Sequence, residues 1–299
     1  MKPSPITTKV NKRATESTPR LLTIEAALRQ GTELLEKAAV GVPRLTAEVL
    51  LSHAMRRKKV YLYAHANDEL TELAWIHYGR YLNERLQGKP TQYITHRQEF
   101  YGRDFYVDGR VLIPRPETEH LVETALDHLR ATPSERVLDV GTGSGAIALS
   151  IAVEAQRTVL ASDISFPALE VAGRNAETHK AKVQLLQADL LDAVAPASID
   201  LLVSNPPYVP GADAANMQVE VREWEPHVAL FAADDGFMIY RKLISAAEIA
   251  VKPAGRLMME LGYRSLDGVS QMLAARWMDV KVIADLAGFP RVIAATLRS

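Results

Sequence analysis

The sequence predicts an α/β protein in which a mostly parallel sheet ends in an antiparallel hairpin, preceded by a small all-α domain. From Glu117 onward, short apolar or β-rich runs alternate with helical segments, which is typical of a parallel sheet covered on both faces. Near the C-terminal end, two more runs are separated only by Gly288-Phe289-Pro290, and so short a link can join only antiparallel strands. The expected strands are Arg136–Val140, Thr158–Ser162, Val183–Leu186, Leu201–Ser204, Arg256–Glu260, Val280–Ala284 and Arg291–Leu297.

The residues before Glu117 do not show this alternation of strands and helices. A polar beginning rich in Lys, Arg, Ser and Thr indicates a disordered tail. Helical stripes of apolar residues follow, and Thr46 is the expected N-cap of one of these helices. Aromatic residues then alternate at Tyr93-Ile94 and Phe100–Val107, which favours a β-hairpin. We therefore divide the chain into a tail (1–20), a helical domain (21–88), a β-hairpin linker (89–116) and the α/β domain (117–299).

The composition limits the possible functions. The chain has 299 residues, a net charge of −1 and no cysteine, which excludes disulfides, thiolate nucleophiles and cysteine-bound metals. A protein that holds nucleic acid by its phosphates usually carries a clear positive excess, which is absent here. No apolar run reaches the roughly 18 residues of a membrane span, and the first residues lack the apolar core of a secretion signal. We expect a cytoplasmic protein.

A glycine-rich turn follows the first strand of the α/β domain and leads into a helix. Glycines in such a turn let the chain bend tightly and let a ligand approach the main chain. Taken alone, the turn is also compatible with NAD or FAD, or with a tight strand–helix connection. It consists of Gly141, Thr142, Gly143, Ser144 and Gly145.

Two details favour S-adenosylmethionine as the ligand of this turn. The spacing G-x-G-x-G lacks the third glycine of the dinucleotide fingerprint. Asp139 also stands just before the turn, where a carboxylate disfavours an anionic pyrophosphate but suits a ligand that carries a sulfonium and an ammonium group.

Acidic residues follow the next two strands. Asp163 lies about 20 residues after the turn, where a carboxylate accepts hydrogen bonds from both ribose hydroxyls, although it could instead cap the helix that begins near Phe166. Asp189 and Leu190 follow the third strand, where the acid suits an adenine amino group and the leucine a ring face. Asp192 competes for this role, and a capping role for Asp189 stays open.

The most informative motif is Asn205-Pro206-Pro207-Tyr208, which follows the fourth strand. Methyl transfer to an amide or exocyclic amine is difficult because the nitrogen lone pair is delocalised. Acceptors on both N–H groups favour a tetrahedral nitrogen, and the Asn205 side chain and the Pro206 carbonyl supply them. The prolines make the turn rigid, and Tyr208 offers a flat face for stacking. The chemistry needs no metal and no covalent nucleophile. The alternative is a rigid structural loop.

From about Thr23 to its end, the sequence closely resembles the bacterial release factor glutamine methyltransferases, the PrmC/HemK family. The glycine turn and Asn-Pro-Pro-Tyr are shared with many amino-methyltransferases, but other motifs are more specific. These are Gly88–Ile94, Val111–Glu119, Glu225–Leu230, Asp235-Gly236, Asp285–Gly288 and Arg291-Val292.

The resemblance implies a helical N-terminal domain for substrate recognition, a β-hairpin linker and a Rossmann-like class I methyltransferase domain. It implies that Gly141 to Gly145, Asp163 and Asn205 bind S-adenosylmethionine, and that Asn205 to Tyr208 hold the glutamine of a Gly-Gly-Gln loop. The implied partners are class-1 peptide chain release factors, and we expect a monomer. The rivals are an adenine-N6 methyltransferase acting on a flipped base of DNA or RNA, and a noncatalytic binding protein on the same scaffold.

Overall fold

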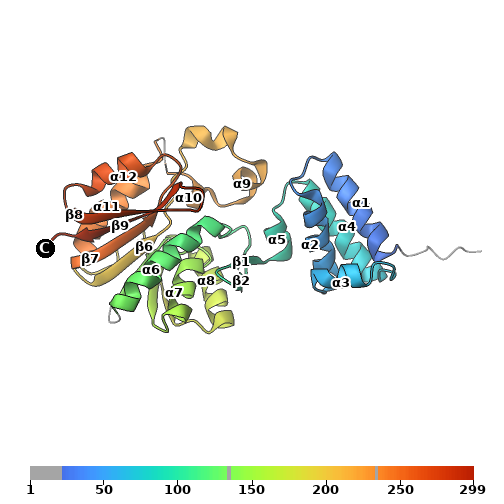
Figure 1. Cartoon of the computed structure of the whole chain (residues 1–299), viewed down its shortest axis with the longest axis horizontal. Coiled ribbons are helices and arrows are strands. Elements are labelled where there is room, and N and C mark those ends of the chain that lie inside the picture. Colours follow the sequence, from blue (N-terminus) through green and yellow to red (C-terminus); the bar gives the residue numbers. More distant parts are fainter. Residues whose placement is uncertain (1–21, 133–135, 233–234) are drawn as a thin grey trace, which may run out of the picture. The chain divides into compact units, whose positions relative to one another are not determined.

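The structure, a computed structural model, describes residues 22–132, 136–232 and 235–299. The tail expected at residues 1–20 lies outside the described residues. The chain divides into two compact units, Met1–Leu86 and Gln87–Ser299, whose elements are labelled in Figure 1. No helix in the described ranges is long and apolar enough to cross a membrane.

The first unit consists mainly of helices among its described residues, with Leu28, Leu50 and Tyr78 buried in its core and one isolated bridge between Thr23 and Glu69. One helix begins earlier than the sequence predicts. Thr46 is not an N-cap but lies inside α2, where its hydroxyl donates a hydrogen bond to the Gly41 carbonyl. Pro43 is the first residue of this helix, because its fixed φ and missing N–H suit that position. The helices are α1 (Ile24–Lys37), α2 (Pro43–Met55), α3 (Lys59–Ala64) and α4 (Glu72–Leu86).

The second unit opens with a short helix and a two-stranded antiparallel sheet. The expected strand at Tyr93-Ile94 is wrong, since these residues lie in α5 (Thr91–Thr95), where both are buried. A pair of apolar residues fits one face of a helix as well as a strand, and the Tyr93 hydroxyl finds a partner in the Val111 carbonyl. The strands are β1 (Gln98–Phe100) and β2 (Arg103–Phe105).

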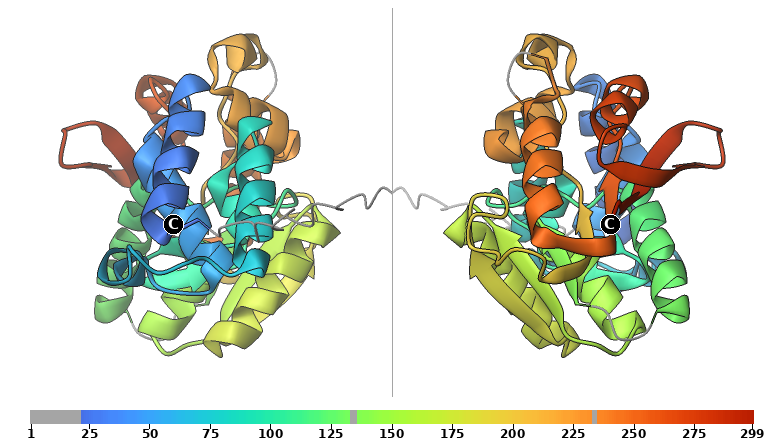
Figure 2. Two further views of the ribbon diagram at one scale, coloured as in Figure 1. Left: turned by 90° about the vertical axis from the view of Figure 1, so that its right-hand side faces the viewer. Right: turned by 90° about the vertical axis from the view of Figure 1, so that its left-hand side faces the viewer.

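The main sheet has seven strands in the order β5-β4-β3-β6-β7-β9-β8, and it confirms the predicted fold class. The first five are parallel, β9 is antiparallel to β7, and β8 is antiparallel to β9. Figure 2 shows the β8–β9 hairpin projecting beside the helical layers. The strands are β3 (Val137–Val140), β4 (Val159–Asp163), β5 (Val183–Gln187), β6 (Ile199–Ser204), β7 (Val251–Glu260), β8 (Trp277–Ala284) and β9 (Pro290–Leu297).

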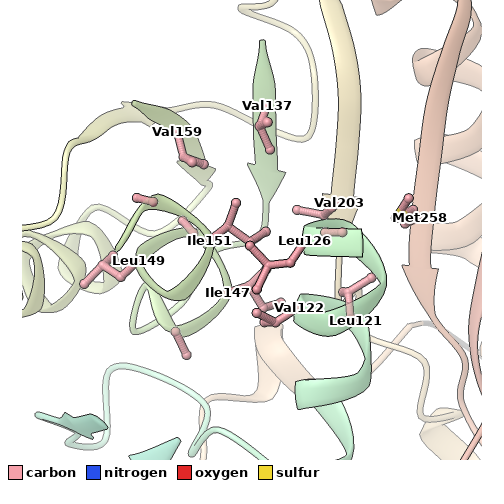
Figure 3. Close-up of a cluster of buried hydrophobic side chains, with 14 of the residues drawn as sticks. Leu121, Val122, Leu126, Val137, Ile147, Leu149, Ile151, Val159, Val203 and Met258 are labelled. Atoms are coloured by element: carbon pink, nitrogen blue, oxygen red, sulfur yellow. The ribbon is translucent and has the colours of Figure 1, made fainter. Parts of the chain in front are cut away.

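Helices cover both faces of the sheet, so its central strands are apolar almost throughout. Side chains of α6 and α7 pack on one face with Val137 and Val203 (Figure 3), and those of α11 and α12 pack on the other with Leu138 and Leu202. The alternation along β3 and β6 directs successive side chains to opposite cores. The helices are η1 (Pro116–Thr118), α6 (Glu119–Ala131), α7 (Ala146–Glu154), α8 (Phe166–His179), η2 (Gly211–Asn216), α9 (Val219–Trp224), α10 (His227–Leu230), α11 (Met238–Ala250) and α12 (Leu266–Leu273).

Candidate active site

The topology brings the two main sequence motifs together. From β3 the chain builds outward through β4 to β5, and it then returns to place β6 on the other side of β3. Ligands of such sheets bind outside the carboxyl ends of the strands at this switch point. Val140 pairs with Ser204 there, and the Ser204 hydroxyl donates a 2.7 Å hydrogen bond to the Val140 carbonyl. The glycine turn and Asn205 therefore leave the sheet side by side.

The glycine turn has a backbone that only glycine adopts easily. Gly141, Gly143 and Gly145 have φ values of 73°, 54° and 83°. A Cβ added at Gly145 would lie 2.5 Å from the Leu149 side chain, whereas one added at Gly141 or Gly143 would meet nothing within 4 Å. Packing therefore restricts Gly145, while Gly141 and Gly143 expose main chain to open space that a ligand can occupy.

Asp139 supports this turn from inside the protein. Its side chain is fully buried, and Oδ2 accepts hydrogen bonds from the Thr142 hydroxyl (2.7 Å) and the Ala148 N–H (3.2 Å). Burial raises the pKa of the Asp139 carboxyl to about 7. Asp139 was predicted from the sequence to face a cationic ligand, and in the structure its carboxyl also fixes the turn and the first residues of α7.

Asp163 holds the turn from the neighbouring strand. Its Oδ2 accepts the Gly143 N–H and its Oδ1 accepts the Ser165 N–H, both at 2.9 Å. The alternative role of capping α8 is wrong, because Ser165 is the N-cap and its hydroxyl accepts the Ala168 N–H. Burial raises the pKa of the Asp163 carboxyl despite these hydrogen bonds. The carboxylate still has lone pairs available for a ligand.

The segment after β5 passes next to Asp163. The Ala188 N–H donates a 3.1 Å hydrogen bond to the Asp163 carbonyl, which brings Asp189 and Leu190 to the same edge of the sheet. The Asp189 side chain is exposed, while Leu190 is half-buried and has a positive φ of 51°. The competitor Asp192 is exposed, and its N–H donates to the Asp189 carbonyl.

These residues fit S-adenosylmethionine. The open main chain of the turn and the lone pairs of Asp163 suit a nucleoside with two ribose hydroxyls, and Asp139 in its ionised form suits a cationic group on that nucleoside. The N terminus of α7 favours a ligand carboxylate. The side chains of Thr142 and Ser144 are buried, so within the turn these residues offer a ligand main chain more than side chain.

Asn205 is held by a residue to which the sequence argument gave no role. Its Nδ2 donates a 3.2 Å hydrogen bond to the Thr118 hydroxyl, and Thr118 is itself buried. Pro206 is buried beside it and Pro207 half-buried. The Tyr208 ring lies against Gly262, where an added Cβ would come within 2.5 Å of a ring carbon. Burial raises the pKa of the Tyr208 hydroxyl to about 12.

Two of the specific sequence motifs meet behind this loop. The buried Glu225 carboxylate accepts a hydrogen bond from the Ile113 N–H at 3.2 Å and forms an ion pair with Arg115. Burial raises the pKa of Glu225 and the Arg115 guanidinium opposes that rise. The ion pair ties the segment before η1 to the segment after α9. Arg115 and Glu225 belong to two motifs that lie far apart in the sequence. Their opposite charges were the signal in the sequence for this contact.

The sheet order, the antiparallel C-terminal strands, the glycine turn at β3 and Asn-Pro-Pro-Tyr at β6 together define a class I S-adenosylmethionine-dependent methyltransferase. The PrmC N-terminal domain family matches residues 26–95, and the methyltransferase small domain family matches residues 119–222. A solved structure of the hMettl16 catalytic domain, in complex with MAT2A 3'UTR hairpin 6, shares this fold with a TM-score of 0.53 and 17% identity, covering 73% of this chain and 81% of that one.

Relatives of similar length give the narrower family. A release factor glutamine methyltransferase of Koribacter versatilis is 42% identical over 91% of this chain and 98% of its own. One of Moorella thermoacetica is 39% identical over 93% of this chain and 99% of its own. The chain belongs to the release factor glutamine methyltransferase family.

Proposed function

We propose that the protein transfers a methyl group from S-adenosylmethionine to the side-chain amide nitrogen of the glutamine in the Gly-Gly-Gln loop of class-1 peptide chain release factors. The observation that carries this proposal is Asn-Pro-Pro-Tyr at the switch point beside the glycine turn, in a chain of this family. A near-neutral chain with a net charge of −1 suits a protein substrate better than a nucleic acid.

Bound S-adenosylmethionine supplies a methyl group on a good leaving group, so the protein has mainly to position the acceptor. The Asn205 side-chain oxygen and the Pro206 carbonyl accept the two N–H groups of the glutamine amide. These hydrogen bonds strengthen as the nitrogen becomes tetrahedral, and they therefore favour the transition state over the ground state. The Tyr208 ring, fixed against Gly262, gives the planar amide a stacking face.

The proposed cofactor contacts follow the edge of the sheet. The main chain from Gly141 to Gly145 faces the methionine portion, and Asp163 accepts the ribose hydroxyls with its free lone pairs. Asp189 and Leu190 contact the adenine, the first at its amino group and the second at its ring face.

We assign partner recognition to the helical unit, and we place the reaction in the cytoplasm, where release factors act, with the enzyme as a monomer. The described helices of this unit expose large apolar side chains, among them Val60 at 70% and Leu73 at 65%. Exposed apolar side chains are what a protein partner would cover. Val60→Ser and Leu73→Ser should raise KM for whole release factor by on the order of tenfold and leave cofactor affinity unchanged. Ile249→Ser is the matched control, because Ile249 on α11 is 64% exposed.

The decisive experiment incubates the protein with labelled S-adenosylmethionine and purified release factor, and locates the methyl group by mass spectrometry. A release factor with the loop glutamine replaced by asparagine is the matched control. The same preparation is offered double-stranded DNA, single-stranded DNA and RNA. Methylated glutamine in release factor alone is the expected result. Methylated adenine with unmodified release factor would replace the proposal by the adenine-N6 rival, and no transfer to any of them would favour a noncatalytic role.

A further inference from the structure

A buried carboxylate stands at the carboxyl end of β7, behind the Asn-Pro-Pro-Tyr loop. Glu260 is 3% exposed, and its Oε2 has no hydrogen-bond partner within the described ranges. Burial raises the pKa of Glu260 to about 7. Such a group is costly to bury, which indicates a role that an apolar residue at the same position could not fill.

The surroundings of Glu260 connect it to the proposed catalytic loop. The Thr118 hydroxyl forms a hydrogen bond with the carboxyl group and lowers its pKa. Glu117 on η1 raises that pKa, and the guanidinium groups of Arg115 and Arg291 lower it. The Tyr208 hydroxyl also lies within electrostatic reach, since Glu260 raises its pKa.

Thr118 stands between Glu260 and Asn205, and a hydroxyl has only one hydrogen to donate. When that hydrogen is directed to the Glu260 carboxylate, the Thr118 oxygen can only accept. The neighbouring amide must then turn its NH₂ group toward Thr118, which is the 3.2 Å contact that Asn205 Nδ2 makes. The Asn205 carbonyl oxygen consequently points away from Thr118.

We infer that Thr118 and Glu260 are positioning residues that fix the orientation of the Asn205 side-chain amide, so that its oxygen and not its NH₂ group is presented to the substrate amide. The inference rests on the proposed function. Reversing the Asn205 amide would place a donor opposite the donor N–H of the substrate, and the hydrogen bond that favours a tetrahedral nitrogen would be lost. The ionised Glu260 carboxylate cannot donate, so above pH 7, where this form predominates, it makes the order of donors and acceptors obligatory.

The test compares three variants with wild type. Thr118→Val removes the hydroxyl at nearly constant size, Thr118→Ser keeps it, and Glu260→Gln supplies an NH₂ group that can donate to Thr118 and so release the hydroxyl hydrogen toward Asn205. Single-turnover methylation is measured at saturating cofactor and release factor, and cofactor affinity is measured by calorimetry. Thr124→Val on α6 is the matched control, because its hydroxyl donates only to the His120 carbonyl within its own helix.

Thr118→Val and Glu260→Gln should each lower kcat by on the order of tenfold to a hundredfold with cofactor affinity nearly unchanged. Thr118→Ser and Thr124→Val should retain kcat near that of wild type. The double variant should lose little more than either single variant, because both interrupt the same chain of hydrogen bonds. Full activity of both Thr118→Val and Glu260→Gln would overturn the inference.

A second readout does not depend on turnover. The side-chain NH₂ resonances of Asn205, assigned by their loss in Asn205→Asp, should shift or broaden in Thr118→Val and in Glu260→Gln but not in Thr118→Ser. Unchanged resonances in all three would also overturn the inference. If wild-type protein does not methylate release factor, the proposed function fails, and the resonances still decide whether Thr118 and Glu260 orient Asn205.

Discussion

Removing the Asp163 carboxylate should weaken cofactor binding, because the carboxylate both contacts the ligand and supports the loop. The Gly143 and Ser165 N–H groups, each at 2.9 Å, donate to this carboxylate, and the Ile164 N–H also stabilises its charged form. The acceptor capacity that remains is what the ribose hydroxyls would use. Asp163→Ala therefore removes hydrogen bonds to the ligand and to the main chain, and an affinity measurement on this variant alone would mix both effects.

Each ribose hydroxyl can be removed separately, which gives the affinity that its contact with Asp163 contributes. A hydrogen bond to a charged group contributes about 1.5–3 kcal/mol, which is roughly 10- to 150-fold in affinity. A 2'-deoxy analogue of S-adenosylhomocysteine should therefore bind wild-type protein on the order of tenfold or more below the parent ligand. In Asp163→Ala the same deletion should cost almost nothing, because the acceptor is already absent. The coupling in this cycle measures the contact itself.

Calorimetric titration of both ligands into both proteins gives the four affinities, and thermal unfolding of the unliganded proteins reports the loop support separately. The Asp163→Ala protein should unfold at a lower temperature, because the Gly143 N–H loses its acceptor. Equal loss of affinity for the deoxy ligand in wild type and variant would show that the 2'-hydroxyl does not contact Asp163. It would assign the ribose to another residue and leave Asp163 only a structural role.

Asn205→Ala should lower kcat by about 10²–10³ in single-turnover methylation while circular dichroism stays unchanged, and near-normal turnover would make the motif structural. Gly262→Ala should displace the Tyr208 ring, which a Cβ would approach to 2.5 Å, and so lower turnover, whereas Gly79→Ala on α4, where a Cβ meets nothing within 4 Å, should leave turnover unchanged. The pKa of Glu260 is raised from 4.5 to about 7, so its favourable contribution is complete below pH 4.5 and is lost as the pH rises through 7. The free energy of unfolding of the unliganded protein should therefore fall across this range in urea titrations, and less steeply in Glu260→Gln; equal slopes would count against the raised pKa.

The fold followed from the sequence where one pattern dominates over a long stretch. The strands of the main sheet were expected within a few residues, because apolar runs of strand length are bounded by clear breaks, and the hairpin followed from the short link at Gly288. Patterns of only two residues did not predict the secondary structure correctly. Tyr93-Ile94 is compatible with a strand or a helix. The surroundings in the folded chain, where the Tyr93 hydroxyl donates to the Val111 carbonyl, favour the helix. At α2 the conspicuous Thr46 obscured the better signal, Pro43.

The residues of the candidate site could likewise be predicted from the sequence only in part. The strand ends at Gly141, Asp163 and Asn205 could be placed at one edge of the sheet from the sequence, because parallel strands carry their carboxyl ends to the same edge. Thr118 could not, since it precedes β3 in a segment with no strand to place it, and only the folded chain brings it to Asn205. Glu260 was expected to end a strand, but its surroundings come from η1 and β9, which belong to distant parts of the sequence.

The buried carboxylates of this edge bear on the choice of ligand. Asp139, Asp163 and Glu260 stand at or near the carboxyl ends of three strands of one sheet, and burial raises the pKa of each. Each also fixes main chain or side chains that lack regular hydrogen bonds, so replacing them by apolar residues would leave the loops unsupported. In their ionised forms they give this edge a negative potential, which attracts a sulfonium and repels phosphates. Arg115 and Arg291 offset part of that potential next to Glu260. The charges therefore favour a cationic cofactor beside an uncharged acceptor, and the side-chain amide of a protein glutamine is an acceptor of that kind.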